Sequence, residues 1–90
     1  MRILFDKDLL KKIGEIKKRN MRLYTRIEKQ LILFEKNPKH HSLRTHKLAG
    51  NLRSSWSISL DRSYRMIYRI TSSGDAYFYM MGTHKDVYIP

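Results

Sequence analysis

The chain has 90 residues, with 19 Lys and Arg against 8 Asp and Glu, and its formal net charge is +11. That length suits one small domain with a single core, and the apolar share of 41% argues against wholesale disorder. So strong a positive charge indicates a polyanionic partner, because Lys and Arg that bind phosphates release counterions. Cysteine is absent, which excludes disulfides, thiolate zinc sites and thiol nucleophiles.

The hydropathy of the chain indicates a cytoplasmic protein. No apolar run approaches the roughly 18 residues that a transmembrane helix needs. The first residues, Met1 to Asp6, lack the long apolar core of a signal peptide. We therefore expect a single domain over residues 1–90, in the cytoplasm and without a membrane partner.

The N-terminal part of the sequence predicts a short strand followed by two helices. Residues 2–5 are compatible with a strand, and Asp6 is a favourable helix N-cap. Apolar residues recur at helical spacing over residues 8–20 and again over residues 21–36. Pro38 ends the second helix, because the residue before a proline avoids the α region. With so short a joint, the helices should form an antiparallel hairpin.

The C-terminal part changes to the period of two that is typical of strands. Residues 37–53 are poor in apolar side chains and predict a loop. Strands are predicted over residues 54–60, 64–70 and 76–81, the last of them apolar nearly throughout and therefore central. The order β-α-α-β-β-β predicts the α+β class, with the helical hairpin on one face of a curved, mainly antiparallel sheet.

Three clusters of polar residues could carry chemistry: residues 39–47, residues 62–65 and residues 82–88. All four histidines lie in the first and third clusters. A metal site is not favoured, because His40 and His41 are adjacent and no carboxylate lies at a useful spacing near them. We expect neither a metal nor another cofactor.

A basic protein rich in His and Arg could instead cleave RNA without a metal. In that reaction the 2′-hydroxyl attacks the adjacent phosphodiester, so a base, a cation for the phosphorane and an acid for the departing 5′-oxygen are needed. Histidine can act as base or acid near neutral pH, and arginine can stabilise the extra phosphate charge. These residue types also occur in nucleic-acid-binding domains that cleave nothing.

Three motifs in order resemble the RelE/ParE superfamily of toxin–antitoxin modules. They are HKLAG at 46–50, WSI at 56–58 and YRMIY at 64–68, and they are similar to the K-L-x-G turn and the Y/H-R-L/I/M-V/I-Y strand of that family. The ending GTHKDVY at 82–88 is similar to that of the YafQ-like ribonuclease branch. The resemblance spans nearly the whole chain and implies the same small α+β fold.

The resemblance implies a ribosome-dependent messenger ribonuclease and assigns roles to four residues. Arg65 matches the arginine that stabilises the transition state, His84 the C-terminal catalytic histidine, and Tyr88 the aromatic residue that packs on the RNA. His46 matches the histidine before the turn, and it is the candidate base by elimination, because the lysine base of RelE is missing from this chain. We expect Arg65 on the sheet face away from the helices. Further basic residues are candidate nucleic-acid contacts: Lys47, Arg53, Arg62, Arg69 and Lys85.

The sequence departs from the family pattern at positions that matter for the reaction. RelE carries two lysines where this chain has Ser57 and Ser59, so the lysine base is missing. YafQ has a His and an Asp around its turn, and only the acid corresponds at residues 60–63. Two alternatives therefore stay open: a non-catalytic ParE-like toxin that poisons DNA gyrase, and an inactive paralogue that only binds nucleic acid. Fold alone does not separate the three.

The charge and the resemblance together indicate the partners. A toxin of this family is silenced by a cognate antitoxin, and a charge of +11 favours an acidic, partly disordered one that folds on binding. The other expected partners are the ribosome and messenger RNA.

Overall fold

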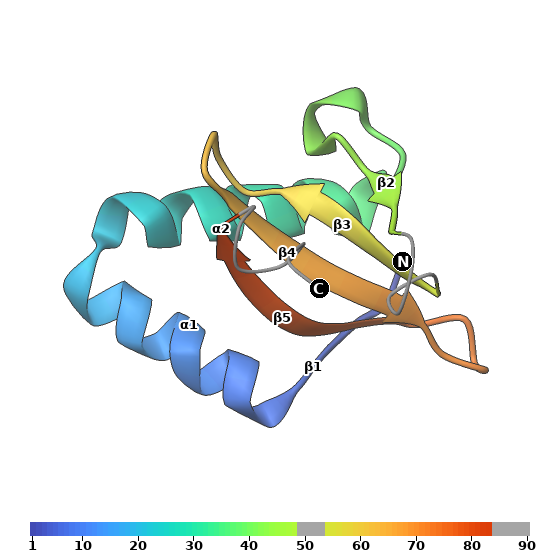
Figure 1. The fold of residues 1–90 in the computed structure, drawn as a ribbon, viewed down its shortest axis with the longest axis horizontal. Coiled ribbons are helices and arrows are strands. Elements are labelled where there is room, and N and C mark those ends of the chain that lie inside the picture. The colour runs from blue at the N-terminus through green and yellow to red at the C-terminus, as the bar shows by residue number, and fades with distance from the viewer. Residues whose placement is uncertain (49–53, 84–90) are drawn as a thin grey trace.

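A computed structural model describes residues 1–48 and 54–83 and confirms the predicted α+β class. The two helices lie on one face of a twisted sheet (Figure 1). Within the predicted loop the chain forms two further short elements, η1 and β2. The elements in chain order are β1 (Ile3–Phe5), α1 (Lys7–Arg19), α2 (Met21–Lys36), the 3-10 helix η1 (His41–Leu43), β2 (His46–Lys47), β3 (Ser55–Ser59), β4 (Tyr64–Ile70) and β5 (Ala76–Thr83).

The boundaries of the helical hairpin are set by side-chain caps. The Asp6 carboxylate accepts hydrogen bonds from the backbone amides of Asp8 and Leu9, which have no partner within the helix. Asn20 ends α1 with its own backbone amide and begins α2 by accepting from the Leu23 amide at 3.1 Å. One residue therefore joins the two helices, as the predicted hairpin required.

The sheet has five strands in the order β1-β5-β4-β3-β2. The pairs β2–β3, β3–β4 and β4–β5 are antiparallel, whereas β1 runs parallel to β5 and Ile3 is paired with Ala76. The sheet is thus mainly antiparallel, as predicted. The predicted third strand, β5, lies between β1 and β4 and extends two residues further than expected, through Gly82 and Thr83.

A β-bulge in β5 changes which side chains face the helices. Ile67 of β4 is paired with Met80, but the next residue, Tyr68, is paired with Phe78, so Tyr79 is an extra residue in β5. Tyr79 and Met80 consequently both pack with Ile67 on the face away from the helices. Beyond the bulge Met81 faces the helices and belongs to the main core.

The main core lies between the hairpin and the sheet. Phe34 of α2 is fully buried, and its ring centroid lies 4.9 Å from that of Tyr68 and 5.2 Å from that of Phe78. Both ring pairs are edge-to-face, an arrangement that aromatic quadrupoles favour. The other buried apolar residues of this core are Leu9, Leu23, Ile27, Leu43, Ile58, Leu60, Met66, Ala76 and Met81.

Neither described helix has the length and apolar character that a membrane crossing requires.

Candidate active site

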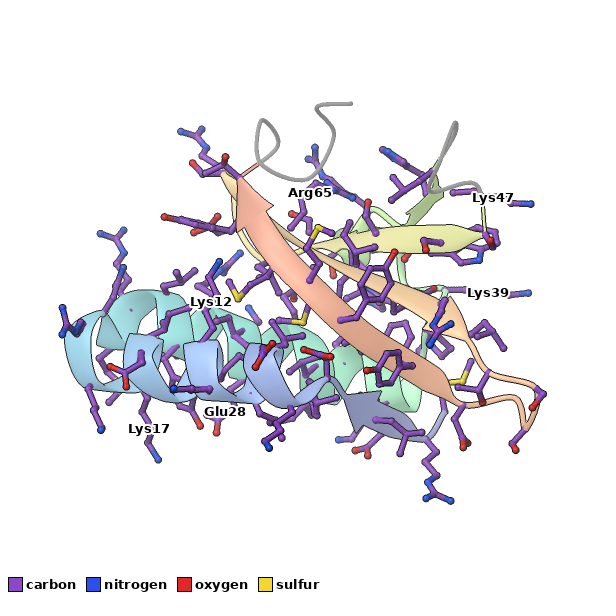
Figure 2. All side chains as sticks on the ribbon, turned by 60° about the horizontal axis from the view of Figure 1, so that its bottom comes forward. Lys12, Lys17, Glu28, Lys39, Lys47 and Arg65 are labelled. Atoms are coloured by element: carbon purple, nitrogen blue, oxygen red, sulfur yellow. The ribbon has the colours of Figure 1, made fainter. Side chains whose placement is uncertain are left out.

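The face of the sheet that the helices leave uncovered carries His46, Ser57 and Arg65 of the predicted motifs. Met66 and Tyr68 of β4 point into the main core, so Arg65 and Ile67, which alternate with them, point to the opposite face. Figure 2 shows Arg65 on the side of the sheet away from α1 and α2, as expected. Opposite Arg65 in β5 stands Gly82, which has no side chain to cover the guanidinium.

Arg65 is held by two hydrogen bonds from one edge of its guanidinium group. Its Nε donates to the Ser57 hydroxyl at 3.0 Å, and its Nη2 donates to the backbone carbonyl of Arg44 at 2.7 Å. Ser57 lies in β3 and is fully buried, while Arg44 follows η1. Three segments of the chain therefore meet at this one side chain.

His46 reaches the same part of the sheet through β2, which the sequence did not predict. In the β2–β3 ladder His46 is paired with Ser57, and paired residues of neighbouring strands share a face of the sheet. Ser57 in turn accepts the hydrogen bond of Arg65. The structure thus brings the candidate base and the candidate phosphate-binding residue beside the same serine. The His46 side chain is exposed.

A groove with five arginines extends from Arg65 around the end of the sheet. Its first part has a volume of about 670 Å³ and its second about 430 Å³; the two share Arg26, Asp61, Arg62 and Ser63 in their lining. We call this continuous hollow the arginine groove. Its five arginines are Arg22, Arg26, Arg44, Arg62 and Arg65, and His41 also lines it.

The charges of the arginine groove are only weakly offset. Its single described carboxylate, Asp61, accepts hydrogen bonds from the backbone amides of Ser63 and Tyr64 at 2.8 and 2.7 Å, which fixes the turn between β3 and β4. The two ion pairs found among the described residues, Arg2–Asp75 and Arg19–Glu15, lie elsewhere. Such a groove attracts a polyanion, and its arginines can bind phosphate oxygens through two parallel hydrogen bonds.

Two predicted nucleic-acid contacts lie apart from Arg65. Lys47 turns toward the other face, where its Nζ lies 5.8 Å from the centroid of the Trp56 ring. Arg69 lies near the far end of β4 with its guanidinium carbon 5.0 Å from the centroid of Tyr77. The hydroxyl of Tyr77 donates to the Asp6 carboxylate, and this hydrogen bond raises the pKa of Tyr77. Of the predicted contacts in the described ranges, Arg62 alone lines the groove with Arg65.

The remaining predicted site residues lie outside the described residues. They are Arg53, His84, Lys85 and Tyr88. Among the residues that are described, no group of three His, Asp or Glu side chains could hold a metal ion.

No role was predicted from the sequence for Arg22, Arg26, Gln30 and Arg44, which line the arginine groove, or for Ser57, which binds Arg65. Arg22 and Arg26 are four positions apart on α2 and so share a helix face, a spacing that was visible in the sequence. Arg44 lies in the polar cluster 39–47, and Ser57 stands where RelE has a lysine, but no sequence pattern predicts that the Arg44 carbonyl and the Ser57 hydroxyl accept hydrogen bonds from Arg65.

Comparison with known proteins gives no sequence relative but several solved structures of the same shape. No protein-family model matches the chain, and no curated protein is similar enough to count as a relative. The YoeB/ParE toxin from Agrobacterium tumefaciens has a TM-score of 0.78 at 15% identity, over 93% of this chain and 99% of that one. YafQ from E. coli has a TM-score of 0.74 at 18% identity, over 99% of this chain and 100% of that one. The YoeB–YefM complex from Staphylococcus aureus has a TM-score of 0.75 at 16% identity, over 93% of this chain and 97% of the matched one.

These likenesses establish the fold. At identities of 15 to 18% they carry no residue-level equivalence by themselves. They do agree with the motifs at 46–50, 56–58 and 64–68, which predicted the same group of proteins from the sequence. The chain has the fold of the RelE/ParE toxins, the YafQ branch included.

Proposed function

We propose that this chain is the toxin of a toxin–antitoxin module and that it cleaves messenger RNA in the ribosomal A site without a metal. One observation carries the proposal: a restrained arginine, Arg65, lies in the arginine groove beside an exposed histidine, His46. The solved toxins with the same fold support the coarser half of it.

The proposed reaction is an internal transesterification of the RNA backbone. His46 takes the proton of the 2′-hydroxyl, whose oxygen bonds to the adjacent phosphorus. Arg65 stabilises the doubly charged phosphorane that forms. The bond to the 5′-oxygen then breaks, and His84 gives that oxygen a proton. A 2′,3′-cyclic phosphate and a free 5′-hydroxyl result. Tyr88 stacks on a base next to the scissile bond.

The proposed partner that silences the toxin is an acidic antitoxin. The net charge of +11 and the arginine groove both favour a polyanionic segment. Among the solved structures of the same fold, YoeB of Staphylococcus aureus forms a heterotetrameric toxin–antitoxin complex with YefM. Toxin, antitoxin and ribosome would meet in the cytoplasm.

Purified protein added to translating ribosomes, with the message ends mapped, tests this function. We expect breaks within the A-site codon that carry cyclic phosphates, and slow cutting of the same message free in solution, because the ribosome supplies the placement of the codon. Lys18→Gln, which removes one charge from α1 outside the groove, should cut like the wild type. DNA breaks that depend on gyrase would support the ParE-like alternative, and binding without cleavage would support an inactive paralogue.

Loss of a groove arginine should reduce the salt dependence of ribosome binding. Arg26→Gln and Arg62→Gln each remove one side chain from the stretch that the two parts of the groove share. Log affinity falls as log salt rises, with a negative slope. If each arginine binds one RNA phosphate, the steepness of that slope should decrease by about 0.7 to 0.9 in each variant. Affinity measured at four or more salt concentrations gives the slope. An unchanged slope in both variants, equal to that of Lys18→Gln, would exclude the groove as an RNA-binding surface.

A further inference from the structure

The guanidinium of Arg65 uses only one of its two hydrogen-bonding forks within the described protein. The fork of Nε and Nη2 is taken by the Ser57 hydroxyl and the Arg44 carbonyl. The second fork, formed by Nη1 and the other hydrogen of Nη2, has no partner among the described residues and adjoins the arginine groove. Two parallel donors of this kind match two oxygens of a phosphate.

The Arg44 carbonyl is aimed at Arg65 by an unusual backbone conformation. Arg44 is the only described residue other than glycine with a positive φ, at φ 47° and ψ 47°. The left-handed region is unfavourable for an L residue, and residues held in it concentrate at functional sites. Here the conformation follows η1, where the Arg44 amide donates to the His41 carbonyl, and it turns the Arg44 carbonyl toward the guanidinium.

A buried glutamine holds this arrangement from the helix side. Gln30 of α2 is 4% exposed, and its side-chain Nε2 donates to the carbonyls of Ser42 at 3.3 Å and Ser59 at 2.8 Å. Ser42 belongs to η1, next to the turn that presents Arg44. Ser59 is the residue of β3 that is paired with Arg65. One amide group therefore fixes both the loop and the strand segment that surround Arg65.

We propose that Gln30, Ser57 and the backbone of Arg44 are positioning residues, a clamp that holds Arg65 so that its second fork is presented to a phosphate. The importance of that phosphate for cleavage rests on the proposed function, but the restraint on Arg65 is a property of the free protein. Ser57, which stands where RelE has a lysine, thus has a role of its own, because its hydroxyl accepts the hydrogen bond from Arg65.

Nuclear magnetic resonance of the free protein tests the clamp without any cleavage assay. The Nε–H signal of Arg65, identified by its loss in Arg65→Lys, should exchange slowly with water. Gln30→Met keeps the volume but removes both donors, and Ser57→Ala removes the acceptor. Each should speed this exchange by roughly tenfold, the value of one hydrogen bond. Ile27→Val, a mild change one turn earlier in the same buried face of α2, should leave the exchange unaltered. Unchanged exchange in Gln30→Met would overturn the proposal.

A cycle of variants then links the clamp to catalysis. Gln30→Met should slow single-turnover cleavage roughly tenfold while ribosome affinity holds, and this loss should disappear in the Arg65→Ala background, because Gln30 acts through Arg65. A loss that persists in that background would make Gln30 a merely structural residue. If the exchange depends on Gln30 but the wild type never cuts message on ribosomes, the clamp stands and the proposed reaction fails.

Discussion

Replacing Arg65 with alanine is expected to slow single-turnover cleavage of ribosome-bound message by about 10²–10³-fold, as with other preorganised donors for a developing charge. Arg65 is buried in part, tied at one fork and open at the other, so no solvent reorganisation is needed when charge builds on the phosphate. Ribosome affinity should change much less, since four other arginines line the groove.

Lysine at position 65 separates charge from geometry. It keeps the positive charge but offers a point-like ammonium in place of two parallel donors, so Arg65→Lys should remain at least about tenfold slower than the wild type. Arg69→Gln provides the contrast, because Arg69 is on the same strand and face but lies over Tyr77. Its loss should weaken binding and leave the chemical step alone. Cleavage by Arg65→Lys within about threefold of the wild type would show that only charge is required there.

Loss of His84 should slow cleavage at least about a hundredfold, the lower bound of what general acid catalysis contributes. One imidazole is a small part of so basic a surface, so His84→Ala should bind ribosomes and antitoxin nearly normally. His84→Gln keeps a hydrogen-bonding side chain without a titratable proton and should be almost as slow. Single-turnover rates and ribosome affinities measured side by side check both variants. A rate for His84→Ala within about threefold of the wild type, far short of acid catalysis, would make His84 a structural residue.

The helical hairpin could be predicted in detail because its signals are local. Asp6, Asn20 and the proline at position 38 act on their immediate neighbours, and the observed helices begin and end where these residues indicated. The strands β3 and β4 were equally clear, since alternation of apolar and polar residues is itself a local pattern. The group of toxins with this fold was also predictable, from three motifs in order.

The parts that could not be predicted depend on partners distant in the sequence. β2 has only two residues, both exposed, and it is defined by its hydrogen-bonded pairing with β3. Two residues are too few to show the periodicity that predicts a strand. The bulge at Tyr79 follows from the register with β4 and has no composition signal. The same holds for the site: alternation places Arg65 and Ile67 on one face without showing which face it is, and no local pattern indicates the hydrogen bond of Arg65 to a backbone carbonyl 21 residues away.

The parallel pairing of β1 with β5 has a consequence for the order of folding. Ile3 is paired with Ala76 and Phe5 with Phe78. The first strand to be synthesised therefore has no neighbouring strand until nearly all of the described chain has been made. Phe78 also completes the ring cluster around Phe34. Contacts so far apart in sequence slow folding, because the loop between them must close first. We therefore expect a nascent chain that lacks β5 to hold a helical hairpin without a closed core, and the protein to reach its native fold only late in its own translation.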